Sequence, residues 1–115
     1  MAQEWIIEIL ANLGLSRVDA KIYYLIASNC PLTAKKIADT LKLRKHQVYR
    51  ALRRLQNRGL IISTINRSAV FSALTFEEVL DLFMKEKWKE ASVLSERREE
   101  LLLSWRLMIE KERNP

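Results

Sequence analysis

The chain has 115 residues, 49% of them hydrophobic, and its formal net charge at pH 7 is +6. This length can bury one hydrophobic core, with an extended helix beside it, and it excludes a second folded unit. One cysteine excludes an internal disulfide, and because we find neither a signal peptide nor an apolar run of about 18 residues, we expect a cytoplasmic protein that does not enter a membrane.

Two amphipathic helices are predicted near the amino terminus. The first covers residues 3–13, ends at Gly14, and has one broad apolar face formed by Trp5, Ile6, Ile9, Leu10 and Leu13. Ser16 is the expected N-cap of the second helix, with Asp19 three residues later as an approximate capping box. This helix extends to about Ser28 and has a core face of Val18, Ile22, Leu25 and Ile26. We interpret the tyrosines of this helix, Tyr23 and Tyr24, as packing residues rather than ligand contacts.

A short helix and a strongly basic helix follow, with a tight connection between them. The short helix has Thr33 as its N-cap and an apolar stripe of Ala34, Ile37, Ala38 and Leu41. Lys42 and Leu43 then lead into residues 44–58, after which Gly59 suits the end of a helix. At about 100° per residue, the core face of this basic helix consists of Val48, Ala51, Leu52 and Leu55. Its opposite face consists of His46, Arg50, Arg53 and Asn57.

Two strands are predicted after Gly59, at residues 60–63 and 68–74, with residues 64–67 as the turn between them. Two helices joined by a short turn and followed by a hairpin form a winged helix-turn-helix. In that fold the first helix braces against the DNA backbone while the second enters the major groove. The expected fold class is therefore mainly α, with a small β-hairpin wing.

Positive charge is concentrated on this part of the chain. Between Asp39 and Glu77 there are eight lysines or arginines and no acidic residue, which is typical of a surface that binds nucleic acid. We predict that double-stranded DNA is contacted at its phosphates by Thr33, Lys35 and Lys36, and at its base edges by Lys45, His46, Gln47 and Arg50. Further backbone contacts are expected from Arg44, Arg53, Arg54 and, at the hairpin tip, Arg67.

The last element is predicted to be a long helix from Phe76 to about Glu112. Thr75 and Glu78 form a capping box at its start, and neither Gly nor Pro interrupts it. An apolar stripe recurs along it with a helical period and cannot remain exposed, so we expect a homodimer joined through this coiled-coil helix. The dimerisation residues expected are Leu94, Leu101, Leu102, Trp105, Met108 and Ile109.

Two features of the long helix leave alternatives open. Arg98 interrupts the stripe, and it is either tolerated at a loosely packed seam or fixes the register against a partner carboxylate such as Glu90 or Glu99. Leu103 and Leu107 lie off the stripe and form a second apolar face. The first helix of the chain is expected to cover that face, from the same chain or from the other subunit.

Several segments resemble the amino-terminal domain of the TrmB family of archaeal regulators. They are LGLSRVDAKIYYLI, PLTAKKIADTL, LRKHQVYRALRRLQNRGLI, the hairpin end FSAL and the helix start TFEEVL, within roughly residues 13–89. The resemblance implies a role in transcriptional regulation. Family members commonly have Pro-Arg-Ser where this chain has Arg44-Lys45-His46, so no base preference transfers. Full-length members also carry a sugar-binding domain after the long helix, which we do not expect here because the chain stops at Pro115.

The predicted function is that of a sequence-specific regulator that binds double-stranded DNA as a homodimer. Residues 1–75 would form the DNA-binding domain and residues 76–115 the dimerisation helix. The alternatives are a non-specific, chromatin-like DNA-coating protein and a winged-helix module that binds an acidic protein. We expect no metal site, because the single histidine, His46, and the single cysteine, Cys30, are distant in sequence. Gly14 and Gly59 cannot build a phosphate-binding loop. We therefore also expect no enzyme activity, cofactor or small-molecule ligand.

Overall fold

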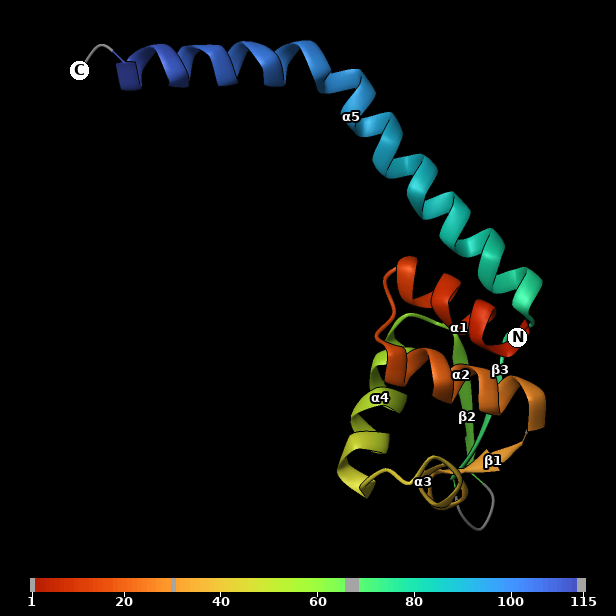
Figure 1. Cartoon of the computed structure of the whole chain (residues 1–115). Coiled ribbons are helices and arrows are strands. Elements are labelled where there is room, and N and C mark those ends of the chain that lie inside the picture. The colour runs from red at the N-terminus through yellow and green to blue at the C-terminus, as the bar shows by residue number, and fades with distance from the viewer. Residues whose placement is uncertain (1, 30, 66–68, 114–115) are drawn as a thin grey trace. The chain divides into compact units, whose positions relative to one another are not determined.

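The computed structural model describes residues 2–29, 31–65 and 69–113 (Figure 1). In chain order these residues form α1 (Ala2–Asn12), α2 (Arg17–Asn29), β1 (Leu32–Thr33), α3 (Ala34–Leu41), α4 (Lys45–Asn57), β2 (Ile61–Ile65), β3 (Ala69–Ala73) and α5 (Phe76–Arg113). Each predicted helix is confirmed to within about one residue at either end, which is as close as helix ends can be assigned. The chain divides into two compact units, Met1–Val79 and Leu80–Pro115, so the first turn of α5 belongs to the first unit.

The predicted wing is present as an antiparallel pair formed by β2 and β3. Ile61 pairs with Ala73 at one end of the hairpin, and Ile65 pairs with Ala69 at the other. The first half of the turn predicted at residues 64–67 is wrong, because Thr64 and Ile65 continue β2. Both residues are β-branched, and such side chains favour extended backbone.

The sheet has a third strand, β1, that has no counterpart among the predicted elements. The strand order is β1-β3-β2, and Leu32 and Thr33 pair with Phe71 and Val70 of β3. A strand of two residues is too short to show an alternating pattern, so only its partner identifies it. This pairing attaches the start of α3 to the wing.

The predicted apolar face of α1 is confirmed in part: Leu10 is buried and Ile6, Ile9 and Leu13 are half-buried, but the buried face is rotated towards Ile7 and away from Trp5. Ile7 and Leu10 are buried, whereas Trp5 is 64% exposed. Successive residues of a helix lie about 100° apart around its axis, and Trp5, Ile6 and Ile7 are all apolar, so several rotations of α1 present an apolar face. Periodicity alone therefore does not select the face that packs against α2.

The core of the first unit combines the buried faces of its helices with the wing. It includes Ala20, Ile22, Tyr23 and Ile26 of α2, Ala34, Ile37 and Ala38 of α3, Val48, Ala51, Leu52 and Leu55 of α4, and Leu60, Ile61 and Phe71. The predicted core face of α4 is confirmed in full. Of the core residues predicted in α2 and α3, Val18, Leu25 and Leu41 are only half-buried. Burying a side chain such as Leu52 contributes about 1.5–3 kcal/mol. The apolar face of α4 thus holds it against α2 and α3.

The long helix α5 contains 38 residues and, at a rise of about 1.5 Å per residue, is about 57 Å long. The predicted capping box at its start is confirmed: Glu78 N–H donates to Thr75 Oγ1 at 3.2 Å, and Thr75 N–H donates to Glu78 Oε1 at 3.4 Å. Val79 in the first turn is buried with the first unit. Residues 84–101 are all exposed, so the second unit is a single helix that has no core of its own.

Candidate nucleic-acid interface

The connection between α3 and α4 is fixed by local hydrogen bonds. Thr33 Oγ1 accepts from the N–H of Lys36 at 3.2 Å, which confirms Thr33 as the N-cap of α3. At the other end, Lys42 adopts a left-handed conformation with φ 56°, and its N–H donates to the carbonyl of Ala38. The N–H of Leu43 donates to the same carbonyl at 3.0 Å. Both bonds are accepted by the Ala38 carbonyl near the end of α3, and the left-handed conformation of Lys42 turns the chain into α4.

Both ends of α4 are also defined by its own residues. Its N-cap is Arg44, whose backbone N–H donates to Gln47 Oε1 at 3.0 Å. Gln47, a predicted base-reading residue, therefore uses its amide oxygen to hold the start of the helix. At the end, Gly59 has φ +76°, the left-handed conformation that a residue with a side chain rarely adopts. The predicted end of the basic helix at Gly59 is confirmed.

The outer face of α4 carries the predicted base-reading residues. Lys45, His46, Gln47 and Arg50 are all exposed, and His46 and Arg50 lie on the side opposite the buried core face. A groove of about 510 Å³ lies on this surface and is lined by His46, Tyr49, Arg50, Arg53, Arg54 and Asn57. The lining contains three arginines and no carboxylate, so the groove attracts anions. Tyr49 is 54% exposed there and presents an aromatic ring among the cations.

Three of the predicted phosphate contacts lie together at the start of α3. Lys35 and Lys36 are exposed in its first turn, while Thr33 is half-buried and its hydroxyl oxygen caps the helix. Arg44 is exposed in the turn that separates α3 from α4. Arg67, predicted at the hairpin tip, and Cys30 lie outside the described residues.

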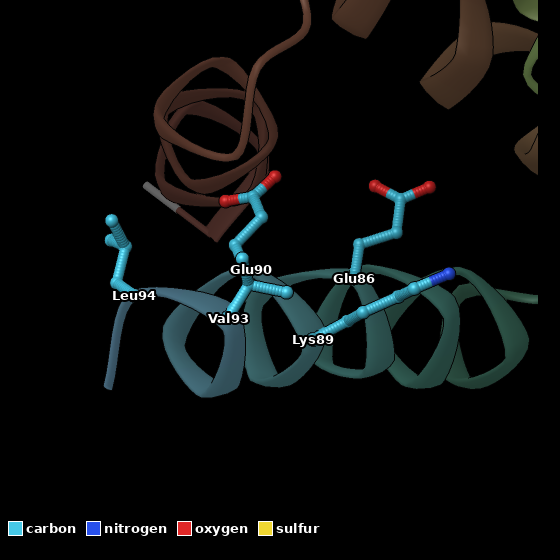
Figure 2. Close-up of a pocket in the computed structure, with 5 residues that line it drawn as sticks. All are labelled: Glu86, Lys89, Glu90, Val93 and Leu94. Atoms are coloured by element: carbon cyan, nitrogen blue, oxygen red, sulfur yellow. The ribbon is translucent and has the colours of Figure 1, made fainter. Parts of the chain in front are cut away.

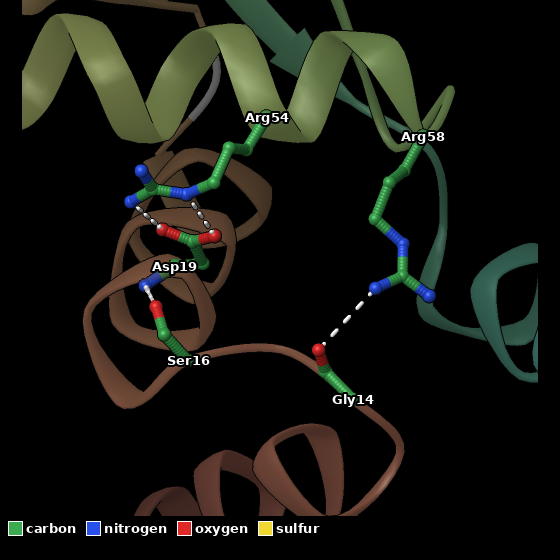
Figure 3. Close-up of polar contacts among 5 residues, drawn as sticks. All are labelled: Gly14, Ser16, Asp19, Arg54 and Arg58. Atoms are coloured by element: carbon green, nitrogen blue, oxygen red, sulfur yellow. Dashed lines mark hydrogen bonds and ion pairs between the residues drawn. The ribbon is translucent and has the colours of Figure 1, made fainter.

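Arg54 is the predicted phosphate contact whose surroundings differ most from the expectation. Its Nε donates to Asp19 Oδ2 at 2.9 Å and its Nη2 donates to Asp19 Oδ1 at 2.8 Å, as Figure 3 shows. Asp19 is only 3% exposed. Hydrogen bonding to this carboxylate raises the pKa of Arg54 above its ordinary value, although partial burial acts in the opposite direction. The guanidinium is therefore bonded to a buried carboxylate of the protein, while the Arg54 side chain as a whole stays 52% exposed.

The same pair corrects the prediction for the start of α2. Ser16 is confirmed as N-cap, because its Oγ accepts from the N–H of Asp19 at 3.0 Å. The carboxylate of Asp19, however, binds Arg54 rather than completing a capping box. Sequence reasoning missed this role, although one signal was present: Asp19 and Asp39 are the only acidic residues among positions 14–60.

Arg58, the C-cap residue of α4, contacts the same region of the first unit. Arg58 Nη1 donates to the carbonyl oxygen of Gly14 at 3.3 Å, one helical turn beyond Arg54 (Figure 3). Gly14 itself has φ +118°, a conformation that strains any residue with a side chain. The segment from Gly14 to Asp19 thus holds α4 at two points along its length.

Tyr23 joins α2 to the end of the wing. Its hydroxyl donates to the carbonyl oxygen of Leu74 at 2.7 Å, and the side chain is 2% exposed. Burial, and to a smaller extent the negative charge of Glu78, raises the pKa of Tyr23 to about 12. The interpretation of Tyr23 as a packing residue is confirmed, and its hydroxyl has in addition a bonding partner that is distant in sequence.

The predicted dimerisation residues lie on α5, and four of the six are exposed. Leu94, Leu101, Trp105 and Met108 are 61%, 47%, 59% and 60% exposed, while Leu102 and Ile109 are half-buried. A hollow of about 540 Å³ along the helix is lined by Leu94, Ser95, Arg98, Leu101, Leu102 and Trp105. Within the same chain, Arg98 Nη1 donates to Glu99 Oε1 at 2.8 Å.

Two further surfaces of α5 adjoin this stripe. A hollow of about 580 Å³ is lined by Glu86, Lys89, Glu90, Val93 and Leu94, and Figure 2 shows both glutamates pointing to one side of the helix. The second apolar face predicted from Leu103 and Leu107 is present, and these side chains are 56% and 57% exposed. Large apolar area is therefore accessible on more than one side of the helix.

Two classes of site are absent from the part of the chain that the structure describes. None of its helices combines the length and the apolar character that crossing a membrane requires. No three His, Cys, Asp or Glu side chains are grouped so that they could hold a metal ion.

A small helical core, a tight turn before an exposed basic helix and a hairpin wing together define a winged helix-turn-helix protein. Solved structures with the same fold support this class. A protein from Sulfolobus tokodaii named ST1889 aligns with a TM-score of 0.65 and 21% identity, over 81% of this chain and 99% of that one. The archaeal chromatin protein TrmBL2 aligns with a TM-score of 0.74 and 21% identity, over 100% of this chain and 46% of the TrmBL2 chain.

A further solved structure is a possible transcriptional regulator from Methanosarcina mazei, with a TM-score of 0.70 and 14% identity, over 80% of this chain and 83% of that one. No curated protein matches the chain. Residues 10–77 match the family described as sugar-specific transcriptional regulator TrmB. Because this match covers more than half of the chain, the protein belongs to the TrmB family. It is a DNA-binding transcriptional regulator and not an enzyme.

Proposed function

We propose that the protein is a homodimeric regulator that binds specific sequences in double-stranded DNA and reads them with α4. The observation that carries this proposal is the cationic outer face of α4, where exposed His46, Arg50 and Arg53 line a groove without carboxylates. The opposite face of the helix is committed to the core. An α-helix fits the major groove of B-DNA, where the edges of the four base pairs differ, so this face is suited to reading sequence.

The proposed contacts divide into those that position the protein and those that read bases. The start of α3 would meet phosphates through Thr33, Lys35 and Lys36, and further contacts would come from Arg44 in the turn before α4 and from Arg53 in α4. Base edges would be read by Lys45, His46, Gln47 and Arg50, with Arg50 directed at a guanine because a guanidinium bonds both of its major-groove acceptors. Arg67 is proposed to meet the backbone or the minor groove from the wing.

Dimerisation is proposed to occur through α5, with residues 1–75 as the DNA-binding domain and residues 76–115 as the dimerisation helix. The support is the exposed apolar stripe that includes Leu94, Leu101, Trp105 and Met108. A soluble helix that lacks a partner rarely exposes so many large apolar side chains on one stripe. A second copy of α5 would cover them and place two reading helices on one duplex.

A second candidate function is non-specific coating of DNA. It is favoured by the likeness over the whole chain to TrmBL2, which is described as a chromatin protein with a novel mode of DNA binding. The two functions differ in one measurable quantity, the ratio of affinities for a preferred duplex and a random duplex.

The test begins with selection of preferred duplexes from a random library by the full-length protein. Affinities for a selected and a random duplex are then measured at about 50 and 200 mM salt, where binding through phosphates weakens steeply. A ratio of about a thousand or more supports the regulator, and a ratio near one supports coating. If no duplex binds even at the lower salt, the DNA-reading role of α4 is wrong, and an acidic protein becomes the partner to seek.

A further inference from the structure

Resting on the proposed reading role of α4, we propose that Asp19 and Arg54 are positioning residues for DNA recognition. Their ion pair fixes the rotation of α4 about its own axis and thereby directs Arg50 and His46 at the base edges. Arg54 does not neutralise a DNA phosphate in this arrangement, although it carries the same charge as its neighbour Arg53.

The geometry of the pair restricts rotation more than a single contact would. Two parallel bonds, Nε to Oδ2 at 2.9 Å and Nη2 to Oδ1 at 2.8 Å, hold the planar guanidinium of Arg54 against the planar carboxylate of Asp19 (Figure 3). Such two-point pairing is specific in direction as well as strong. The carboxylate is itself fixed, because Asp19 lies in the first turn of α2, is 3% exposed, and donates its N–H to Ser16 Oγ.

A second contact strengthens the argument that this side of α4 is an anchor. Arg58 lies four residues after Arg54, on the same side of the helix, and bonds the carbonyl oxygen of Gly14 at 3.3 Å. Arg50 and Arg53 line the exposed groove together with His46, and Arg54 borders the same groove while its guanidinium is bonded to Asp19. Arg54 and Arg58 thus bond other parts of the first unit, whereas Arg50 and Arg53 line the groove.

Base reading requires that α4 be held at a precise rotation about its own axis. The outer surface of an α-helix lies about 5–6 Å from its axis, so a rotation of about 20° moves an exposed side chain by about 2 Å. A bidentate bond from Arg50 to a guanine does not survive that displacement, since good hydrogen bonds span only about 2.7–3.2 Å. The apolar face of α4 sets its approximate orientation, and the pair removes the remaining freedom.

Charge attraction and a positioning role predict opposite changes in DNA affinity for the substitution Asp19→Asn. Asp19→Asn removes a negative charge near the DNA-binding face, so simple charge attraction would strengthen binding to every duplex. Positioning predicts instead that affinity for the selected duplex falls by about tenfold, the loss expected when one bidentate base contact fails. Affinity for a random duplex should stay equal or rise slightly, because it depends on phosphate contacts alone.

The matched comparison is Arg54→Gln with Arg53→Gln, which remove the same charge from adjacent positions. Arg54→Gln should lower affinity for the selected duplex by about tenfold and leave the slope of log affinity against log salt unchanged. Arg53→Gln should weaken both duplexes alike and reduce that slope by about one per subunit. The double variant Asp19→Asn with Arg54→Gln should bind about as poorly as either single variant, because both remove one interaction.

Circular dichroism and urea unfolding must first show that each variant is folded under the binding conditions. If Arg54→Gln is not folded, Arg54→Lys replaces it, since lysine keeps the charge but not the two-point geometry. It should lose specificity at an unchanged salt slope.

The positioning role is overturned if Asp19→Asn binds the selected duplex as tightly as the wild type or more tightly. It is equally overturned if Arg54→Gln lowers the salt slope as Arg53→Gln does. A wild type that binds no duplex would overturn the proposed function itself, so the two failures are distinguishable.

Discussion

Substitution of Tyr23 by phenylalanine should change the pH dependence of stability as well as its magnitude. The hydroxyl of Tyr23 donates to the carbonyl oxygen of Leu74 at 2.7 Å in a site where the side chain is 2% exposed. Burial, with a smaller contribution from Glu78, raises the pKa of this hydroxyl from 10.0 to about 12. In the unfolded chain the same hydroxyl ionises near its ordinary value of about 10.

The size of the effect follows from the bond and from the shift in pKa. At neutral pH the variant should be less stable by about 0.5–1.5 kcal/mol, the net contribution of one hydrogen bond. The raised pKa stabilises the folded state below pH 10, and this contribution is lost as pH rises towards 12, by about 1.4 kcal/mol per pH unit. The total loss is about 2–3 kcal/mol. Phenylalanine cannot ionise, so the two proteins should be equally stable near pH ~11 and the variant more stable above it.

The assay is urea unfolding followed by circular dichroism, at one protein concentration, from neutral pH to about pH 11.5, with the difference between the two proteins plotted against pH. Tyr24→Phe is the control, because it removes a hydroxyl from the next, half-buried residue of α2 and reports general effects of alkaline pH. The free energies of unfolding of wild type and Tyr23→Phe should differ by an amount that changes with pH. If that difference stays constant from pH 9 to pH 11.5, to within about 0.3 kcal/mol, the fold does not hold the hydroxyl in its protonated form.

Three further predictions address the reading helix, the dimer and the turn after α4. Arg50→Ala should cost about 1–3 kcal/mol on a selected duplex and much less on random duplex, and an unchanged ratio of the two affinities would mean that α4 is not the reading helix. Replacing Leu101 and Trp105, which are 47% and 59% exposed, by glutamate should convert the proposed dimer to monomer or aggregate in sedimentation velocity, and a wild type that is already monomeric refutes the α5 interface. Gly59→Ala should destabilise the protein by about 1–2 kcal/mol in urea unfolding, because φ +76° is unfavourable for alanine although nothing lies within 4 Å of the added carbon; a cost near zero would show that the turn relaxes.

Some of the fold could be predicted from the sequence because its causes are local. Thr33 and Thr75 cap α3 and α5 through bonds to residues three positions later, and Gly59 ends α4 through its own backbone conformation. The separation of α4 into a buried face and a cationic face follows from helical periodicity over one segment. For the same reason, periodicity is sufficient to place Arg50 on the exposed side of the helix.

Other parts of the candidate site depend on contacts between distant residues, which no local pattern encodes. Arg54 and Asp19 are 35 positions apart, and their pairing changes the interpretation of Arg54 from a surface cation to an anchor. Tyr23 and Leu74 are 51 positions apart, so the partner of the hydroxyl could not be foreseen from either segment. Both partnerships exist only because packing brings α2 into contact with both α4 and β3.

The amino-terminal helix α1 and the strand β1 also show the difference between properties set by local sequence and properties set by contacts with distant residues. The spacing of Trp5, Ile6, Ile9, Leu10 and Leu13 was sufficient to predict a helix with an apolar side, but packing selected the face that is buried, which leaves Trp5 exposed and Ile7 buried. Leu32 and Thr33 became a strand only because β3 offers them backbone hydrogen-bonding partners. The starts, ends and charges of the helices depend on neighbours within about four residues, so they could be predicted from the sequence. Which face of a helix is buried and which charges are paired could not, because these properties depend on surfaces that meet only after the chain has folded.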